Sequence, residues 1–254
     1  MIRKKYSEIP IRNFIFITII IATIASWIYI FDKTESMNGN SMGFTMGMSI
    51  IPFLVIWTIM MVAMMFPSVF PMVASFEHFY ISRYKMGKPI VPVWVFLAGY
   101  TAIWILFGFF VYWGVLGISW IAKHFPQGQG YSYIFLGILF IVAGVYQVTP
   151  FKNTCLGKCR SPMEFIRTSW REGYNGAFVM GFVHGLYCLG CCWLLFLLMF
   201  PIGLMNITAM GVLALIIFSE KTLSLGTKLN KPSAIILIFI GITIILSPNI
   251  LRIF

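Results

Sequence analysis

The stretch NGAFVMGFVHGLYCLGCCWLLFLLMF, residues 175–200, decides the fold class of this chain. Its 26 residues contain no Asp, Glu, Lys or Arg. A helix needs about 20 mostly apolar residues to cross the hydrocarbon core of a bilayer. Residues 175–200 therefore predict a transmembrane helix.

Six further apolar runs of this kind lie along the chain. Of its 254 residues, 60% are hydrophobic and only 10% are charged, whereas soluble proteins carry about 25% charged residues. This composition excludes a water-soluble globule and predicts one all-α domain, residues 1–254, a multi-pass bundle of about seven helices in the cell membrane. The predicted spans are 14–31, 50–72, 91–118, 131–148, 175–200, 203–219 and 233–251.

The distribution of Lys and Arg predicts the orientation of these spans. With the N-terminus in the cytoplasm, 15 of the 18 basic residues fall in cytoplasmic segments and 3 fall outside, which is the positive-inside pattern. Seven spans then put the C-terminus outside. The net charge of +11 is explained by this orientation in the lipid bilayer, so it does not indicate a nucleic-acid partner.

Four methionines lie on one face of the second span, in the stretch MMVAMM at residues 60–65. At 100° per residue, their thioethers occupy a stripe about 140° wide. Pro67 cannot donate a hydrogen bond to the carbonyl of Ala63, which predicts a helix kink and an available backbone acceptor. Methionine also fills irregular gaps between helices, so packing is the alternative explanation. The four residues are Met60, Met61, Met64 and Met65.

One histidine and three cysteines share a stripe about 100° wide on the fifth span. A seam of small residues at positions 177, 181 and 185 follows the same side, and such a seam lets another helix approach closely. An ionisable residue inside a membrane is a functional candidate, although a buried cysteine also behaves as a small hydrophobic residue. The four candidates are His184, Cys188, Cys191 and Cys192.

The two stripes are expected at similar depths near the bilayer centre, since a helix rises about 1.5 Å per residue. Met210, near the start of the sixth span, is positioned to join them. Thioethers, thiols and one imidazole form a soft donor set, which favours Cu(I). Structural zinc sites use Cys and His without thioethers. The sequence therefore predicts an intramembrane Cu(I) site, with Zn²⁺ as the second choice.

Two other groups are secondary candidates for metal binding. A first external loop at residues 37–48 carries several methionines among Gly, Ser and Asn, and it either captures Cu(I) or rests on lipid headgroups. A C-x₃-C pair lies in residues 150–162, a segment expected to be a cytoplasmic loop, where it would receive a metal or exchange disulfides. The secondary candidates are Met42, Met46, Met48, Cys155 and Cys159.

Glu220 and Lys221 stand at the inner end of the sixth span. The pair would serve as an ion pair or a proton site, or anchor the helix at the membrane interface. Anchoring is the commoner role of charged residues at a helix end.

In their order along the chain, these motifs resemble a prokaryotic family of uncharacterised integral membrane proteins predicted to bind metal, some members of which are labelled copper chaperones. The resemblance extends over most of the chain, and it implies a membrane protein that binds a metal. The residues that carry it are Trp57-x₂-Met60-x₂-Ala63-Met64-Met65-x-Pro67, Lys152-x₂-Cys155-Leu156-x₂-Cys159-Arg160-x-Pro162, Gly181-x₂-His184-Gly185-Leu186-x-Cys188-x-Gly190-Cys191-Cys192-Trp193, Met205-Asn206-x₃-Met210 and Glu220-Lys221.

Three functions stay open at this level. The first is the handling of Cu(I), by transfer or delivery, with a copper donor or acceptor protein as partner. The second is an enzyme, a transmembrane thiol–disulfide relay that uses the pairs Cys188/Cys191 and Cys155/Cys159. The third is an accessory subunit of a larger membrane complex, in which Met and Cys only pack. The thioether stripe favours copper, because a relay has no use for it, and the sequence contains no motif of hydrolytic catalysis.

Overall fold

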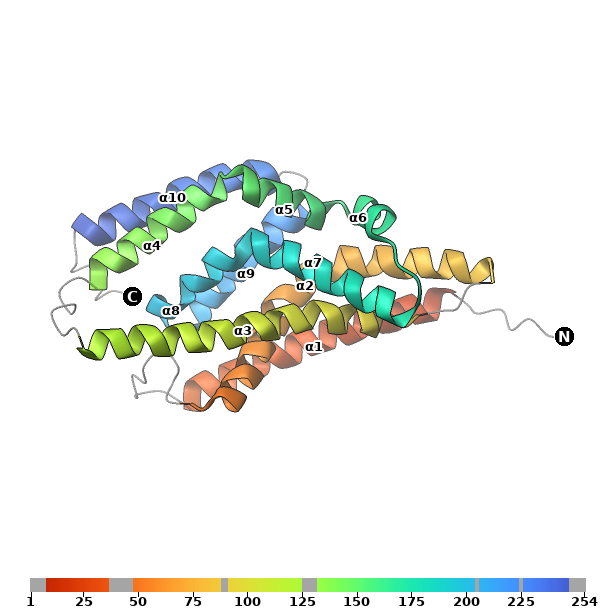
Figure 1. Cartoon of the computed structure of the whole chain (residues 1–254), viewed down its shortest axis with the longest axis horizontal. Coiled ribbons are helices and arrows are strands. Elements are labelled where there is room, and N and C mark those ends of the chain that lie inside the picture. The colour runs from red at the N-terminus through yellow and green to blue at the C-terminus, as the bar shows by residue number, and fades with distance from the viewer. Residues whose placement is uncertain are drawn as a thin grey trace.

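A computed structural model describes residues 8–36, 48–87, 91–124, 132–203, 206–223 and 226–246. Within these ranges every regular element is a helix, which confirms the all-α prediction. Figure 1 shows the long helices running roughly along one direction. The elements are α1 (Glu8–Ser36), α2 (Ile50–Lys85), α3 (Val93–His124), α4 (Ser132–Gln147), α5 (Pro150–Arg160), α6 (Pro162–Ser169), α7 (Gly173–Leu197), α8 (Met199–Ile202), α9 (Ile207–Thr222) and α10 (Gly226–Leu246).

Five of the described helices, α1, α2, α3, α7 and α10, are long and apolar enough to cross a membrane. The bent pair of α4 and α5 makes a sixth if it counts as one span. α9 has 16 residues, fewer than the roughly 20 of a full crossing. The chain therefore has the helices of a membrane protein, while the number of seven spans and their orientation stay predictions.

The expectation that residues 150–162 form a loop is wrong, because most of this segment is the helix α5. Its position on the cytoplasmic side stays a prediction. α4 ends at Gln147 and α5 begins at Pro150, with an angle of 61° between them. Pro150 has no N–H with which to continue α4, and Thr149 before it is extended (φ −67°, ψ 146°), as a residue before proline usually is. The Thr149 hydroxyl then accepts a hydrogen bond from the backbone N–H of Lys152 and caps the new helix.

α5 resembles a loop in sequence because only one of its faces is buried. That face carries Lys152, Cys155 and Leu156, whereas the rest of the helix is exposed or half-buried and mixes polar residues with the exposed Phe151. The hydropathy averaged over the whole segment is low, so it does not indicate that one face is buried. The position of α5 has a direct consequence for the site described below, since its buried face packs against α7.

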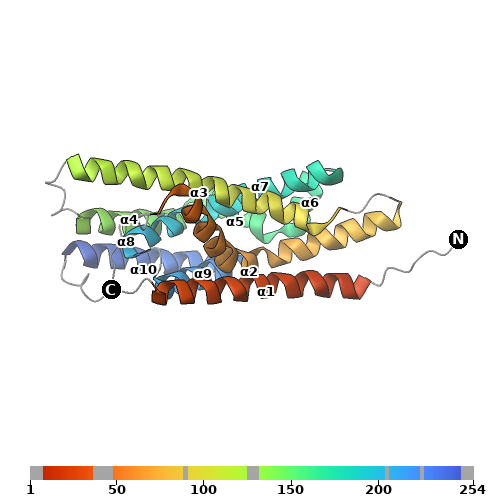
Figure 2. The ribbon, with the colours of Figure 1, turned by 90° about the horizontal axis from the view of Figure 1, so that it is seen from below.

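Glycines bring two pairs of helices into close contact. A Cβ atom on Gly241 of α10 would lie 2.6 Å from the carbonyl oxygen of Gly137 in α4. A Cβ atom on Gly181 of α7 would lie 1.9 Å from the carbonyl oxygen of Phe96 in α3. Figures 1 and 2 show α4 beside α10. In the view of Figure 1, α7 and α9 lie between this pair and the helices α3 and α1. The small-residue seam predicted on α7 is therefore used, and α3 is the helix that fills it.

α2 changes direction along its length, as Figures 1 and 2 show, and it contains Pro67 and Pro71. Prolines inside a helix are a common cause of such bends. The carbonyl of Ala63, which Pro67 cannot use, accepts a hydrogen bond from Trp27 Nε1 of α1 at 3.2 Å. The bend and the backbone acceptor both agree with the prediction for this span.

Candidate functional site

The thioethers of α2 and the ligand candidates of α7 all lie in the protein interior. None of these side chains is more than 3% exposed, and Met210 of α9 is equally buried. The methionines and cysteines among them belong to one continuous cluster of packed residues. The buried residues are Met60, Met61, Met64, Met65, His184, Cys188, Cys191, Cys192 and Met210.

Lys221 joins the two stripes. Its Nζ lies 2.8 Å from Cys188 Sγ and 3.8 Å from Met65 Sδ, and the Ser68 hydroxyl is 3.5 Å away. One atom thus touches sulfur from α2 and from α7. The expectation that Lys221 anchors its helix at the membrane interface is wrong, because the side chain is buried and reaches into the bundle from the last turn of α9.

α3 supplies a further contact to the same thiol. Tyr100 Oη lies 3.0 Å from Cys188 Sγ, with the proton on either atom. Tyr100 reaches α7 because Gly181 and Gly185 let the two backbones approach: a Cβ atom on Gly185 would lie 3.2 Å from the Tyr100 carbonyl oxygen. Cys188 therefore has polar contacts from α3 and α9 together.

The C-x₃-C pair of α5 belongs to the same cluster. Cys159 is half-buried and packs against the core cluster that contains Cys188 and Cys191. Cys155 lies against α7 at Gly190, where an added Cβ atom would be 2.9 Å from Cys155 Sγ. All five cysteines are free. The fold thus gathers thiols that the sequence separates by about thirty residues.

The thiols of α7 do not all point to one position. Cys191 Sγ and Cys192 Sγ both donate hydrogen bonds to the carbonyl oxygen of Cys188, at 3.0 and 2.8 Å. In the described part of the chain, no three His, Cys, Asp or Glu side chains are grouped as a metal site. Cys188 is therefore the α7 thiol that faces Lys221 and Met65, and its neighbours on α7 are turned to the backbone.

His184 lies one turn before Cys188 in an aromatic environment. Its ring centre is 5.8 Å from that of Tyr100, 5.9 Å from that of Phe96 and 5.3 Å from that of Phe165. Nδ1 of this buried ring has no hydrogen-bond partner among the described residues. Buried polar atoms in folded proteins usually have a hydrogen-bond partner, so Nδ1 is available to bind a ligand.

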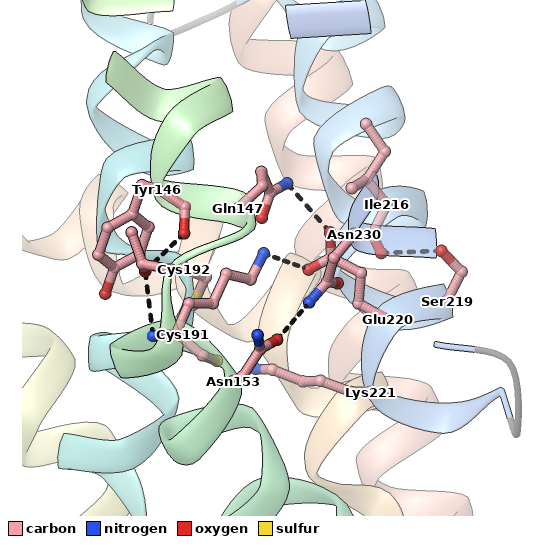
Figure 3. A network of polar contacts seen from close by, with 12 residues as sticks. Tyr146, Gln147, Asn153, Cys191, Cys192, Ile216, Ser219, Glu220, Lys221 and Asn230 are labelled. Carbon is pink, nitrogen blue, oxygen red and sulfur yellow. Dashed lines mark hydrogen bonds and ion pairs between the residues drawn. The ribbon is translucent and has the colours of Figure 1, made fainter. Parts of the chain in front are cut away.

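Polar side chains from four helices meet behind the thiols, at the break between α4 and α5. Lys152 Nζ lies 2.7 Å from Glu220 Oε2, and Gln147 Nε2 donates to Glu220 Oε1 at 3.0 Å. Asn230 of α10 donates to Asn153 at 3.1 Å. Figure 3 shows Gln147, Asn153, Glu220 and Asn230 around this point, with Cys191 and Cys192 on the neighbouring helix.

The basic residues of α5 are directed away from its thiols. Lys152 pairs with Glu220, Lys158 pairs with Glu164 at 2.9 Å, and Arg160 donates to the carbonyl oxygen of Leu223 at 2.7 Å. Positive charge at the sulfur cluster comes instead from Lys221. The sequence shows Glu220 and Lys221 only as adjacent residues. Nothing in it indicates that the two side chains have different partners, Lys152 for Glu220 and Cys188 for Lys221.

The Met-rich segment at residues 37–48, which the sequence predicts to be an external loop, is described only at its end. Met42 and Met46 lie outside the described residues. Met48 is half-buried, and its carbonyl oxygen accepts a hydrogen bond from the Tyr112 hydroxyl at 3.2 Å. The candidate role of these three methionines stays a prediction.

Comparison with known proteins identifies the family. No curated protein and no solved structure matches the chain. The model of one family, PpoB2, described as copper chaperone, matches residues 54–244, which include the stripe of α2, the thiols of α5 and α7, and Lys221. This match spans most of the chain and agrees with the resemblance noted from the sequence motifs. The protein therefore belongs to the PpoB2 copper chaperone family.

Proposed function

We propose that this protein binds Cu(I) in the interior of its helix bundle and passes it to or from a partner protein. The observation that carries the proposal is the meeting of Met65 and Cys188 at one point, the Lys221 ammonium. A thioether and a thiol from separate helices form a soft donor pair, which suits Cu(I) better than harder cations. Membership of a copper chaperone family supports the same metal.

The proposed ligands are Met65 and Cys188, completed by a third donor. Cys159 is the first candidate for that place, because it packs against the core cluster that contains Cys188. His184 is the second, because its Nδ1 has no hydrogen-bond partner among the described residues. Met60, Met61, Met64 and Met210 line the same core, while Cys191 and Cys192 would join after rotating away from the backbone.

We also propose a multi-pass location in the cell membrane with the N-terminus in the cytoplasm. Lys152 and Lys221 are buried within the bundle, so they no longer count as loop residues. Without them, 13 basic residues remain on the predicted inner side and 3 on the outer side. The positive-inside pattern is therefore kept. In this orientation α5 and α6 would connect the thiols to the cytoplasmic surface.

Replacement of either central ligand is expected to weaken Cu(I) binding. Cys188→Ser and Met65→Leu should each raise the dissociation constant by at least the roughly tenfold that loss of a supporting contact at a metal site costs. The measurement is competition with a chromophoric Cu(I) chelator, in detergent and without oxygen. Met163→Leu serves as the control, because Met163 is a half-exposed methionine of α6. Wild-type protein that takes up no Cu(I) under these conditions would refute the proposal.

A thiol–disulfide relay is the second candidate function, and the packing of both α5 cysteines against the thiol-bearing core around α7 favours it. In such a relay Cys159 and one α7 thiol would form a disulfide and lose two electrons and two protons. An incoming disulfide would accept them and become two thiols.

The relay predicts a specific pattern of thiol alkylation. Cys159 and one of the α7 cysteines should become protected together after treatment with a disulfide oxidant, as measured by peptide mass spectrometry. If the thiols are instead protected by bound copper, lose this protection when a chelator removes the copper, and do not respond to the oxidant, the result would support metal binding and exclude the relay.

A further inference from the structure

The ammonium of Lys221 has unusual surroundings for a buried positive charge. Among the described residues its contacts are Cys188 Sγ, Met65 Sδ and the Ser68 hydroxyl, and none of these is a carboxylate oxygen. A second buried lysine, Lys152, has Glu220 Oε2 at 2.7 Å. Two lysines in one interior are thus held in different ways, one by a carboxylate and the other by soft sulfur atoms.

Buried charge must be compensated by partners, since the interior solvates it poorly. For Lys221 the compensation comes mainly from Cys188, at 2.8 Å. The ammonium therefore occupies the place beside Cys188 and Met65 that a Cu(I) ion would need. Two positive charges about 4 Å apart repel each other strongly in the low dielectric of a protein interior. The metal and the ammonium cannot share this place.

We propose that Lys221 is a displaceable internal cation, which occupies the site when no metal is present and is expelled when Cu(I) arrives. This inference rests on the proposed function and adds to it a mechanism of exchange. The sulfur of Cys188 keeps a positive partner in both states, so copper is released without leaving that sulfur unpartnered in the interior. Membership of the family does not by itself imply this exchange of the ammonium for Cu(I).

The position of Lys221 on α9 provides a way out for the ammonium. Thr222 is the last residue of α9, and the following residue, Leu223, is 51% exposed. A lysine near a helix end extends its flexible four-carbon stem so that the charge reaches the surface while the stem stays against apolar atoms. Arg160 holds the carbonyl oxygen of Leu223, so the backbone of this helix end stays attached to α5 while the side chain moves.

Lys152 has no equivalent freedom. Its side chain is fully buried and is held by the carboxylate of Glu220, the residue that precedes Lys221 on α9. Displacement therefore changes the surroundings of one lysine and leaves the other paired. This difference between the two lysines makes the inference testable within a single protein sample.

The experiment measures amine labelling with and without Cu(I). Detergent-purified full-length protein is treated anaerobically with a membrane-permeant acetylating reagent, before and after loading with one equivalent of Cu(I), and acetylation is quantified for each lysine by peptide mass spectrometry. We expect acetylation of Lys221 to rise about tenfold on loading, because a buried group becomes accessible. Exposed Lys228 should be labelled equally in both samples. Mg²⁺, which requires oxygen ligands, should leave Lys221 protected.

The copper content of the same samples separates the possible failures. If one equivalent of Cu(I) binds and Lys221 stays protected, displacement is wrong while the proposed function stands. If no Cu(I) binds, the proposed function and this inference both fall. If Mg²⁺ exposes Lys221 as much as Cu(I) does, the exposure reflects general loosening of the bundle, and displacement is again wrong.

Discussion

Glu220→Ala is expected to lower the free energy of unfolding by about 3–5 kcal/mol, because it leaves the Lys152 ammonium buried without its carboxylate. Both side chains are almost completely inaccessible, so solvent cannot replace the lost partner. Gln147 also loses its acceptor, Glu220 Oε1. The change should appear as a lower thermal midpoint of the purified protein in detergent, followed by circular dichroism.

Two further variants separate the loss of an ion pair from the loss of a side chain. Lys152→Met combined with Glu220→Leu removes both charges at once, and it should recover most of the stability, since replacing a whole buried pair by apolar residues is often neutral. Glu164→Ala breaks the exposed pair with Lys158 and should cost much less than Glu220→Ala, because solvent screens the two charges. A double variant no more stable than Glu220→Ala would contradict the ion-pair explanation.

Gly181→Ala is expected to separate α3 from α7 and to cost about 3 kcal/mol, the upper end of the usual range for overpacking. The new Cβ atom would lie 1.9 Å from the carbonyl oxygen of Phe96, and a backbone atom cannot move aside as the end of a side chain can. Separation of these helices also draws the Tyr100 hydroxyl away from Cys188 Sγ. The same thermal unfolding measurement detects the loss of stability.

Glycines with more space provide a graded control. A Cβ atom on Gly185 would come no closer than 3.1 Å to Ile103, so Gly185→Ala should cost less than Gly181→Ala. Gly211 in α9 has nothing within 4 Å of the added atom, and Gly211→Ala should stabilise the helix by up to about 1 kcal/mol. Equal effects at Gly181 and Gly211 would show that close helix packing does not limit stability here.

The copper and relay experiments address the site, whereas these stability experiments address the framework that holds it. Gly181 holds α7 against α3, and the Lys152–Glu220 pair joins α5 to α9. A framework variant that keeps its fold and alters Cu(I) affinity would link the two. The exchange of Lys221 connects them directly, because Lys221 follows Glu220 on the same helix.

The apolar runs determined the helices of α1, α2, α3, α7 and α10, because hydrophobicity over about 20 residues is a local property. The methionine stripe of α2 and the thiol stripe of α7 were also determined locally, through the helical repeat. Burial of both stripes followed, because apolar and sulfur-bearing faces pack inward against other helices. The resemblance of these motifs to a metal-binding family needed no fold at all.

The tertiary structure alone decided which partners these faces have. Lys152 and Lys221 look like interfacial charges in a sequence, yet both are buried, because Glu220 and Cys188 come from distant segments to compensate them. Cys155 lies against Gly190 of α7 because the chain bends at Pro150, where α5 leaves the direction of α4. Such contacts join residues that are far apart in the chain, so their energies depend on packing that no local pattern contains.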